Sequence, residues 1–310
     1  MIALLAGGTG AARFLLGLAR VVDPRRLTVI GNTGDDLDCW GLHVSPDLDT
    51  VTYALAGLLD PARGWGVRED TFHCLGAMAR LGHETWFRLG DRDLATHLHR
   101  TRLLREGRSL GEATETLRRA LGVPGPILPM SNDPVRTRIR TPEGWLAFQE
   151  FFVRERAKVE VLEVRYEGAA RARPGPGVLE ALRDAEAVIV CPSNPVTSVG
   201  PILAIPGVVE ALRATLAPTL AVTPIVGGAP VSGPAGRLMA ALGLPVSAVG
   251  VAAYYRDWLD LLVVDERDAD LVPAVEALGV RTAVADTLRT DGARAAALAR
   301  NALAALGVPG

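Results

Sequence analysis

Lysine is almost absent from this chain of 310 residues, because Lys158 is the only one and the other basic residues are arginines. A nucleotide-binding P-loop of the GxxxxGK[ST] type requires lysine, so the glycine-rich stretch near the N-terminus is not such a loop. Any phosphate held there must be bound by backbone N–H groups, by arginine or by a metal ion.

Cysteine is also scarce, with only Cys39, Cys74 and Cys191 along the chain. Their odd number and scattered positions argue against a disulfide framework and fit a reducing compartment, so we expect a cytoplasmic protein. The sequence has no CxxC or HExxH pairing that would indicate a structural zinc site.

Basic tracts and long apolar runs are missing as well. The formal net charge is −2, so nothing in the composition supports nucleic-acid binding. No apolar run approaches the length of a membrane span, and no basic region precedes the apolar N-terminal stretch, so we expect neither a membrane partner nor a signal peptide. The chain is nevertheless 49% hydrophobic and can bury a large core.

Short apolar runs alternate with helix-like stretches such as 178–184 and 208–216, which predicts an α/β fold. We expect a Rossmann-like, mostly parallel sheet flanked by helices. The expected strands are residues 2–6, 27–31, 187–191, 220–224, 248–251 and 261–265.

The segment 61–122 breaks this alternation, because it is charged, helical in pattern and without a convincing strand. Its last helix is expected to start at a capping box formed by Ser109 and Glu112. We interpret the segment as a helical insertion beside a Rossmann-like core made of residues 1–60 and 123–310. After it, the stretch "RTRIRTPEGWLAFQEFF" predicts a hairpin around its Pro-Glu-Gly turn.

Gly8, Thr9 and Gly10 follow the first expected strand and open an apolar helix-like run. Ligands of open parallel sheets bind beyond the carboxyl ends of strands, near helix N-termini, so this turn is a candidate phosphate site. The pattern departs from GxGxxG at Arg13, and the next acidic residues come later than a nicotinamide site requires, so an NAD(P)-dependent oxidoreductase is disfavoured. A tight turn that binds nothing is the plain alternative.

Five aspartates lie within fifteen residues after the second expected strand. Carboxylates near a strand end can hold Mg²⁺ or act as a general base. Turn and capping chemistry is the alternative, and Asp49 could be the N-cap of the helical run that follows it. The aspartates are Asp35, Asp36, Asp38, Asp47 and Asp49.

Polar stretches also follow later strands. "AVIVCPSNPVTSVGP" supplies Ser193 and Asn194, and "LAVTPIVGGAPVSGPAG" supplies further hydroxyls and glycines. Hydroxyl and amide groups donate hydrogen bonds to phosphate oxygens. Because the carboxyl ends of parallel strands meet at one edge of a sheet, these stretches are expected to converge with the opening loop.

A series of longer motifs runs from one end of the chain to the other. In order, they are "GGTGAARFLLGL", "NTGDD", "SPDLDT", "RGWGVREDTF", "LGDRDLATH", "LPMSNDPV", "PSNPVTSVGPIL", "SGPAG" and "YYRDWLD". Through them, and over essentially its whole length, the chain resembles the CofD family, called FbiA in actinobacteria. These are the 2-phospho-L-lactate transferases of deazaflavin coenzyme F-420 biosynthesis. The YvcK-like proteins, which look like nucleotide-sugar-binding regulators, share the glycine-rich start, but "SPDLDT" together with "LGDRDLATH" favours the transferase.

The resemblance implies that the acceptor is Fo, a deazaflavin with a ribityl chain. The implied donor is a guanosine diphosphate ester of 2-phospholactate or of enolpyruvate. The ribityl 5′-hydroxyl attacks the phosphorus that carries the organic acid, GMP leaves, and the phosphodiester is coenzyme F-420-0 or its dehydro form. Mg²⁺ and a homodimer are implied as well, whereas the acid of the donor stays open.

For the donor, we hypothesise that Gly8, Thr9 and Gly10 hold the diphosphate with help from Ser193 and Asn194.

For the chemistry, we hypothesise that Asp35, Asp36 and Asp49 bind the metal, and that Asp36 or Asp49 deprotonates the ribityl hydroxyl. The resemblance associates Asp49 and Arg88 with Fo, and a surface charge on the insertion is the alternative for Arg88. Asp49→Asn is expected to nearly abolish turnover and to leave the fold intact.

Asp93 and His97 would share a helix face, where they either line the cleft or pair with each other. Trp40, Trp65 and Trp86 could stack on a flat ring, but we expect each of them in the core.

Overall fold

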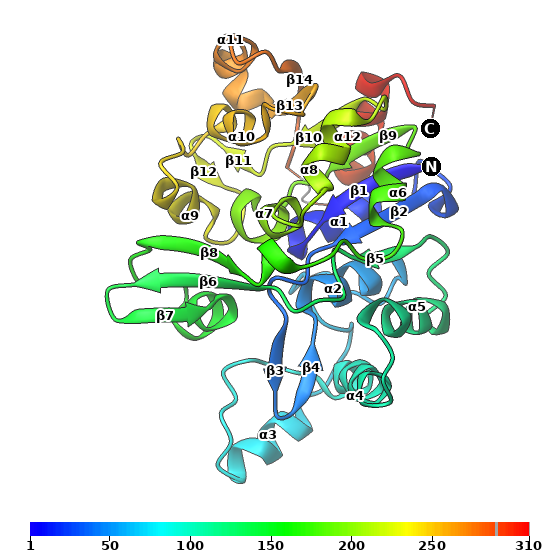
Figure 1. The fold of residues 1–310 in the computed structure, drawn as a ribbon, viewed down its shortest axis with the longest axis vertical. Coiled ribbons are helices and arrows are strands. Elements are labelled where there is room, and N and C mark those ends of the chain that lie inside the picture. Colours follow the sequence, from blue (N-terminus) through cyan, green and yellow to red (C-terminus); the bar gives the residue numbers. More distant parts are fainter. Residues whose placement is uncertain (289–290, 310) are drawn as a thin grey trace.

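The main element of the fold is a seven-stranded parallel sheet, seen in a computed structural model that describes residues 1–288 and 291–309. The strands lie in the order β14-β13-β10-β9-β1-β2-β5, and each neighbouring pair is parallel (Figure 1). Their bounds are β1 (Ile2–Ala6), β2 (Leu27–Gly31), β5 (Ile127–Pro129), β9 (Ala187–Val190), β10 (Thr219–Val222), β13 (Leu261–Asp265) and β14 (Arg281–Ala285). The expected α/β fold is therefore confirmed.

The direction in which the sheet is wound reverses between β1 and β9. From β1 the chain proceeds outward through β2 to β5, and it then returns to the other side of β1 to add β9, β10, β13 and β14. Ile2 of β1 therefore pairs with Leu27 on one side and with Ala187 on the other. Such a reversal leaves a crevice at the carboxyl ends of the two central strands, where ligands of this architecture bind.

Helices cover both faces of the sheet, and the side chains of β1 alternate between the two cores as a pleated strand requires. Ile2 and Leu4 belong to one core, and Ala3 and Leu5 belong to the other. The first core is covered by α1 (Gly8–Leu18), α2 (Pro46–Leu55), α5 (Leu110–Ala120) and α12 (Gly292–Leu306), the second by α6 (Val178–Arg183), α7 (Gly200–Leu203), α8 (Val208–Ala214), α9 (Ala235–Ala241), α10 (Ala248–Tyr255) and α11 (Val272–Glu276).

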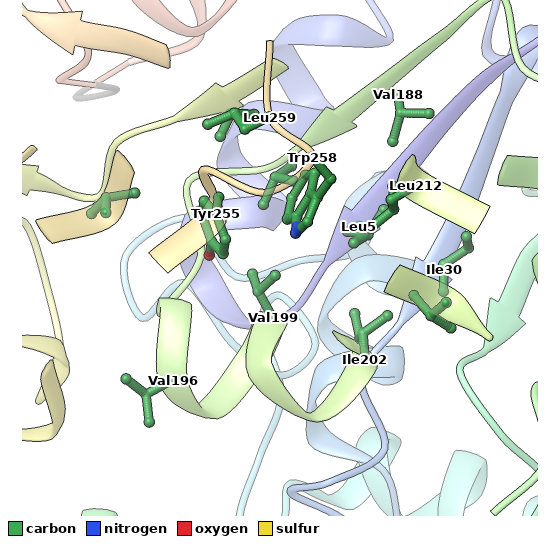
Figure 2. Close-up of a cluster of buried hydrophobic side chains, with 14 of the residues drawn as sticks. Leu5, Ile30, Val188, Val196, Val199, Ile202, Leu212, Tyr255, Trp258 and Leu259 are labelled. Atoms are coloured by element: carbon green, nitrogen blue, oxygen red, sulfur yellow. The ribbon is translucent and has the colours of Figure 1, made fainter. Parts of the chain in front are cut away.

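Figure 2 shows part of the second core, where the turn after β9 is anchored. Val196 and Val199 lie on the short π-helix η4 (Pro195–Val199), and both are fully buried together with Ile202 of α7. The buried side chains fix the backbone that carries the polar loop after β9. No single helix in the described ranges is long and apolar enough to cross a membrane; Pro195–Leu203 and Val208–Ala214 reach that length only as a pair bent by 84°.

Smaller antiparallel elements stand beside the parallel sheet. β6 (Arg136–Thr141) and β7 (Gly144–Ala147) form the predicted hairpin, and β8 (Glu163–Glu167) pairs with the other edge of β6. Two further hairpins are β3 (Leu37–Cys39) with β4 (Leu42–Val44), and β11 (Ile225–Val226) with β12 (Ala229–Pro230). Short helical turns are η1 (Pro24–Arg26), η2 (Glu150–Arg154), η3 (Ala169–Arg171) and η5 (Glu266–Leu271).

The segment 61–122 contains α3 (His73–Arg80), α4 (Asp91–Arg105) and α5, and no named strand lies within it. The capping box at the start of α5 is confirmed, because Ser109 Oγ accepts from the Glu112 N–H and the Glu112 carboxylate accepts from the Ser109 N–H. In Figure 1, α3 and α4 lie near the β3–β4 hairpin, away from the parallel sheet. The division into a core and a helical insertion stays a prediction.

One expected strand is wrong, because residues 248–251 form the first turns of α10. Ser247 caps this helix by accepting a hydrogen bond from the Gly250 N–H. Short, wholly apolar runs do not distinguish a buried strand from a buried helix. Two strands of the sheet, β5 and β14, were not among those expected, and β5 is only three residues long.

Candidate active site

A cavity of ≈ 480 Å³ opens at the carboxyl ends of β1 and β9, where the winding of the sheet reverses. Its floor is polar and comes from the loops after these strands and from the start of α2. Its walls come from the segment 61–122, from η2 and from the loop between β12 and α9. The floor residues include Gly7, Gly8, Thr9, Gly10, Asp35, Asp47, Asp49, Ser193, Asn194, Thr197 and Ser198.

The N-terminus of α1 forms one edge of the floor. The Gly7 N–H donates to Ser193 Oγ at 3.3 Å, which joins the loops after β1 and β9. A Cβ on Gly7 would come within 2.7 Å of Ser198 Cβ and would collide with the Asp47 carboxylate, so only glycine permits this approach. Gly8 has a φ of 69°, which also favours glycine. The Gly7 and Gly8 N–H groups donate to Ser193 and Asp47, so the N–H groups of Thr9 and Gly10 are those of this helix start that suit a phosphate.

Ser193 and Asn194 both line the cavity, so the structure brings them to the same place as Gly8, Thr9 and Gly10. Asn194 Oδ1 accepts from the Val196 N–H at 3.0 Å and caps η4. Its amide N–H groups are therefore the part of this side chain that can bind a ligand. The five residues hypothesised for the donor diphosphate converge as the parallel strands predict.

Asp35 and Asp47 are buried carboxylates on the cavity floor. Burial raises the pKa of Asp47 to about 6, against the effect of hydrogen bonds from Asn32, Gly8 and Ser198. Burial and then the negative charge of Asp47 raise the pKa of Asp35 well above its ordinary value. Oδ1 of Asp35 has no hydrogen-bond partner. The ionised form of both carboxyl groups is therefore disfavoured, and a bound cation would stabilise it.

Asp36 does not line the cavity, unlike its neighbour Asp35. Its Oδ2 lies 2.9 Å from His43 Nε2 and accepts from Ser45 Oγ at 2.9 Å. The side chain is thereby directed toward the β3–β4 hairpin and the start of α2. Asp36 was hypothesised as a metal ligand and as a base, but its side chain contacts residues next to the cavity and does not line the cavity itself.

Asp49 lines the cavity but is paired with a buried arginine. Arg100 of α4 donates to both carboxylate oxygens of Asp49, with 3.0 Å between Nη1 and Oδ2. Burial alone would lower the pKa of Arg100, but the charge and hydrogen bonds of Asp49 outweigh burial and raise it. Asp49 is not an N-cap, because α2 begins at Pro46 and its N-cap is Ser45. This ion pair ties the segment 61–122 to the core.

From the sequence, Asp93 and His97 were expected either to line the cleft or to pair with each other. In the structure they do both. His97 Nε2 lies 3.2 Å from Asp93 Oδ1, and Tyr53 donates to the same oxygen at 2.7 Å. Burial raises the pKa of Asp93, but His97 and Tyr53 outweigh burial and the net effect is to lower it. Asp93 therefore keeps its negative charge in the wall.

Arg88 lines the cavity from the segment 61–122 and has no carboxylate partner among the described residues. Its guanidinium lies 4.6 Å from the centre of the Phe72 ring, on which Arg63 also packs at 5.2 Å. Cation–π contacts of this kind hold the guanidinium without neutralising it. Arg88 is thus available to an anionic or polar ligand group, as the resemblance implies.

Aromatic side chains of the cavity come mainly from positions that the sequence patterns did not indicate. Phe148 and Phe152 line it from the segment around η2. Trp65 also lines it, whereas Trp40 and Trp86 do not. None of the three tryptophans is buried in the core as expected, since each is half-buried.

No group of three or more His, Cys, Asp or Glu side chains within residues 1–288 and 291–309 is arranged to hold a metal ion by itself. Mg²⁺, however, is commonly bound by one or two carboxylates together with substrate phosphates. Asp35 and Asp47 fit that role, because both face the cavity, their charges are unfavourable and Oδ1 of Asp35 is unpartnered. Asp36 does not line the cavity, and the Asp49 carboxylate is already neutralised by Arg100.

A glycine-rich helix start and acidic side chains at the reversal of a parallel sheet are typical of α/β proteins that bind phosphate-containing ligands. The family model described as "2-phospho-L-lactate transferase CofD" matches residues 2–302. The chain therefore belongs to the CofD family.

Two relatives of this chain carry different names. The 2-phospho-L-lactate transferase of Methanosarcina mazei is 46% identical over 288 residues, which are 93% of this chain and 94% of its own. The phosphoenolpyruvate transferase of Kitasatospora aureofaciens is 46% identical over 310 residues, covering 98% of this chain and 97% of its own.

Among solved structures, a crystal structure of a UPF0052 family member from Bacillus halodurans matches with a TM-score of 0.65 and 18% identity. The match covers 97% of this chain and 98% of the other. At this identity the similarity concerns the fold alone.

Proposed function

We propose that this protein transfers a phosphate-linked organic acid from a guanosine diphosphate-activated donor to the ribityl 5′-hydroxyl of Fo, with release of GMP. The proposal rests on membership of the CofD family and on one observation. The helix start at Gly8, the loop at Ser193 and the carboxylates of Asp35 and Asp47 face one cavity. A phosphoryl transfer needs such a site, because positioning and charge neutralisation do most of the catalytic work.

The donor diphosphate would lie at the N-terminus of α1. The Thr9 and Gly10 N–H groups would bind the anion, because those of Gly7 and Gly8 donate to Ser193 and Asp47. The Ser193 hydroxyl and the Asn194 amide can add hydrogen bonds from the facing loop. Lys158 does not line the cavity, so the negative charge of the diphosphate would be met by backbone N–H groups, by arginine and by a metal ion.

Mg²⁺ would be held by Asp35 and Asp47 together with the donor phosphates, and when bound it would neutralise negative charge on the diphosphate. Asp36 would hold the start of α2 in place, because it accepts from the hydroxyl of Ser45, the N-cap of α2, and also contacts His43 of β4. Asp49 would keep the role in acceptor binding that the family resemblance implies, held in place by Arg100.

The acceptor would enter between the segment 61–122 and η2. Arg88 belongs to the segment 61–122, and Phe148 and Phe152 belong to the segment around η2; all three line the cavity together with Asp49. The two relatives differ in whether phospholactate or phosphoenolpyruvate stands in their names. Both acids are therefore candidates for the donor.

A mass-spectrometric assay tests this proposal. The protein is incubated with Fo, Mg²⁺ and either the lactyl or the enolpyruvyl guanylated donor. We expect GMP and the matching Fo phosphodiester, and the faster donor identifies the acid. Omission of Fo is the control, since GMP released without acceptor would be hydrolysis.

The regulatory alternative predicts a different result. A nucleotide-sugar-binding protein would release no GMP from either donor and would bind a nucleotide sugar in a calorimetric titration. That combination would overturn the proposed transferase.

A further inference from the structure

Phe148 and Phe152 form a stacked pair in the cavity wall. Their ring centres are 5.6 Å apart and their planes differ by 12°. Phe148 is only 6% exposed, whereas Phe152 keeps 39% of its surface accessible even though Phe148 covers one face of its ring. An aromatic ring so exposed in a cavity wall offers its uncovered surface to a ligand.

The pair is held in a defined orientation by the segment around η2. Phe148 also contacts Phe151, which is fully buried, at 6.4 Å between ring centres. The Glu150 carboxylate accepts from the Ala147 N–H at 2.8 Å, and the Ala157 N–H donates to the Phe151 carbonyl at 2.8 Å. The stacked rings are therefore arranged before any ligand binds.

A contact beside the pair joins η2 to the segment 61–122. Arg154 of η2 forms an ion pair with Glu84 at 2.5 Å, and its guanidinium lies 4.7 Å from the centre of the Trp86 ring. Phe87 and Arg88, which follow directly, line the cavity. The Arg154 contact thus links the Phe148–Phe152 pair to the segment that carries the arginine associated with the acceptor.

We propose that Phe152, backed by Phe148, is the stacking surface for the planar deazaflavin ring of Fo, and this inference rests on the proposed function. A flat heteroaromatic ring gains free energy from offset stacking on an exposed aromatic face. The acceptor fits this surface better than guanine does, because Arg154 of η2 contacts Glu84 and Trp86, close in sequence to Arg88, whereas the donor loops at Gly8 and Ser193 belong to other elements.

The test is a calorimetric titration of Fo and, separately, of the guanylated donor into wild type and Phe152→Ala. We expect Phe152→Ala to weaken Fo binding about tenfold, in the range found for one base–aromatic stack, and to leave donor binding unchanged. Steady-state kinetics should agree, with a raised KM for Fo and an unchanged KM for the donor. Phe152→Trp should retain Fo affinity, and Phe152→Leu, which keeps apolar volume without a π face, should not.

Leu162→Ala is the matched control, since Leu162 is 47% exposed but does not line the cavity. It should leave Fo affinity as in wild type. Unchanged Fo affinity in Phe152→Ala would overturn the inference and leave the proposed function standing. Weakened donor affinity with unchanged Fo affinity would assign the surface to guanine instead. Wild type that fails to bind Fo would overturn the proposed function and this inference with it.

Discussion

Asp47 is a carboxylate whose charged form is disfavoured by folding, since burial raises its pKa from 3.8 to about 6. The stability that the protonated group contributes is full below the unfolded pKa and is lost as the pH rises through about 6. In the presence of a chelator, thermal unfolding of wild type should therefore show a loss of stability between pH 4 and pH 7. The loss should be smaller in Asp47→Asn, where buried Asp35 still titrates.

The same substitution should nearly abolish turnover and remove the rise in Tm that we expect Mg²⁺ to cause in wild type at pH 8. Asp270→Asn, which removes an exposed carboxylate, is the control. Equal pH profiles for wild type and Asp47→Asn would contradict the assignment of this carboxylate. Asp47 was one of five candidate aspartates in the sequence, and only the packing of α2 against Gly7 distinguishes it from the others.

Asp49 behaves differently, because its partner Arg100 is only 1% exposed. Asp49→Asn leaves a buried guanidinium without its counter-charge, which typically costs about 3–5 kcal/mol. We therefore expect a large loss of stability in urea unfolding, contrary to the intact fold expected from sequence. The double variant Asp49→Asn, Arg100→Met should recover most of the lost stability. An Asp49→Asn protein as stable as wild type would contradict this account.

At the scale of elements, the start of α1 depends on the absence of a side chain at Gly7. Gly7→Ala should destabilise the protein and weaken donor binding, since the new Cβ would collide with Asp47 and Ser198. Gly76→Ala in α3 is the control, because its nearest neighbour is the end of the Arg80 side chain at 4.0 Å. There alanine should stabilise the helix by about 0.5–1 kcal/mol. Denaturant unfolding of both variants would check that the free energy of unfolding falls in Gly7→Ala and rises in Gly76→Ala.

The elements also determine how much of the site could be predicted from sequence. Gly8 and Ser193 could be placed together because the ends of parallel strands share one edge of a sheet. Phe148 and Phe152 could not, since their position depends on how η2 packs against a distant segment through Arg154. The residues 248–251 were assigned to a strand because a short apolar run fits either buried element.

At the scale of the whole molecule, the homodimer implied by the family stays a prediction. Light scattering of the purified protein should give about twice the chain mass of 32.7 kDa. A mass equal to one chain would contradict it. The measurement should be repeated with Fo and donor, since a ligand that favours one assembly shifts the observed mass.

The position of β1 has a consequence for how the protein is made. β2 leaves the ribosome soon after β1, but β9, which pairs with the other edge of β1, begins only at Ala187. At 5–20 residues per second, the ribosome needs roughly 8–30 s to reach β9 after completing β2. Throughout that interval the edge of β1 that will pair with β9 is unpaired, and unpaired edges favour aggregation. Nascent chains should therefore be most vulnerable, and most dependent on chaperones, before the second half of the sheet has emerged.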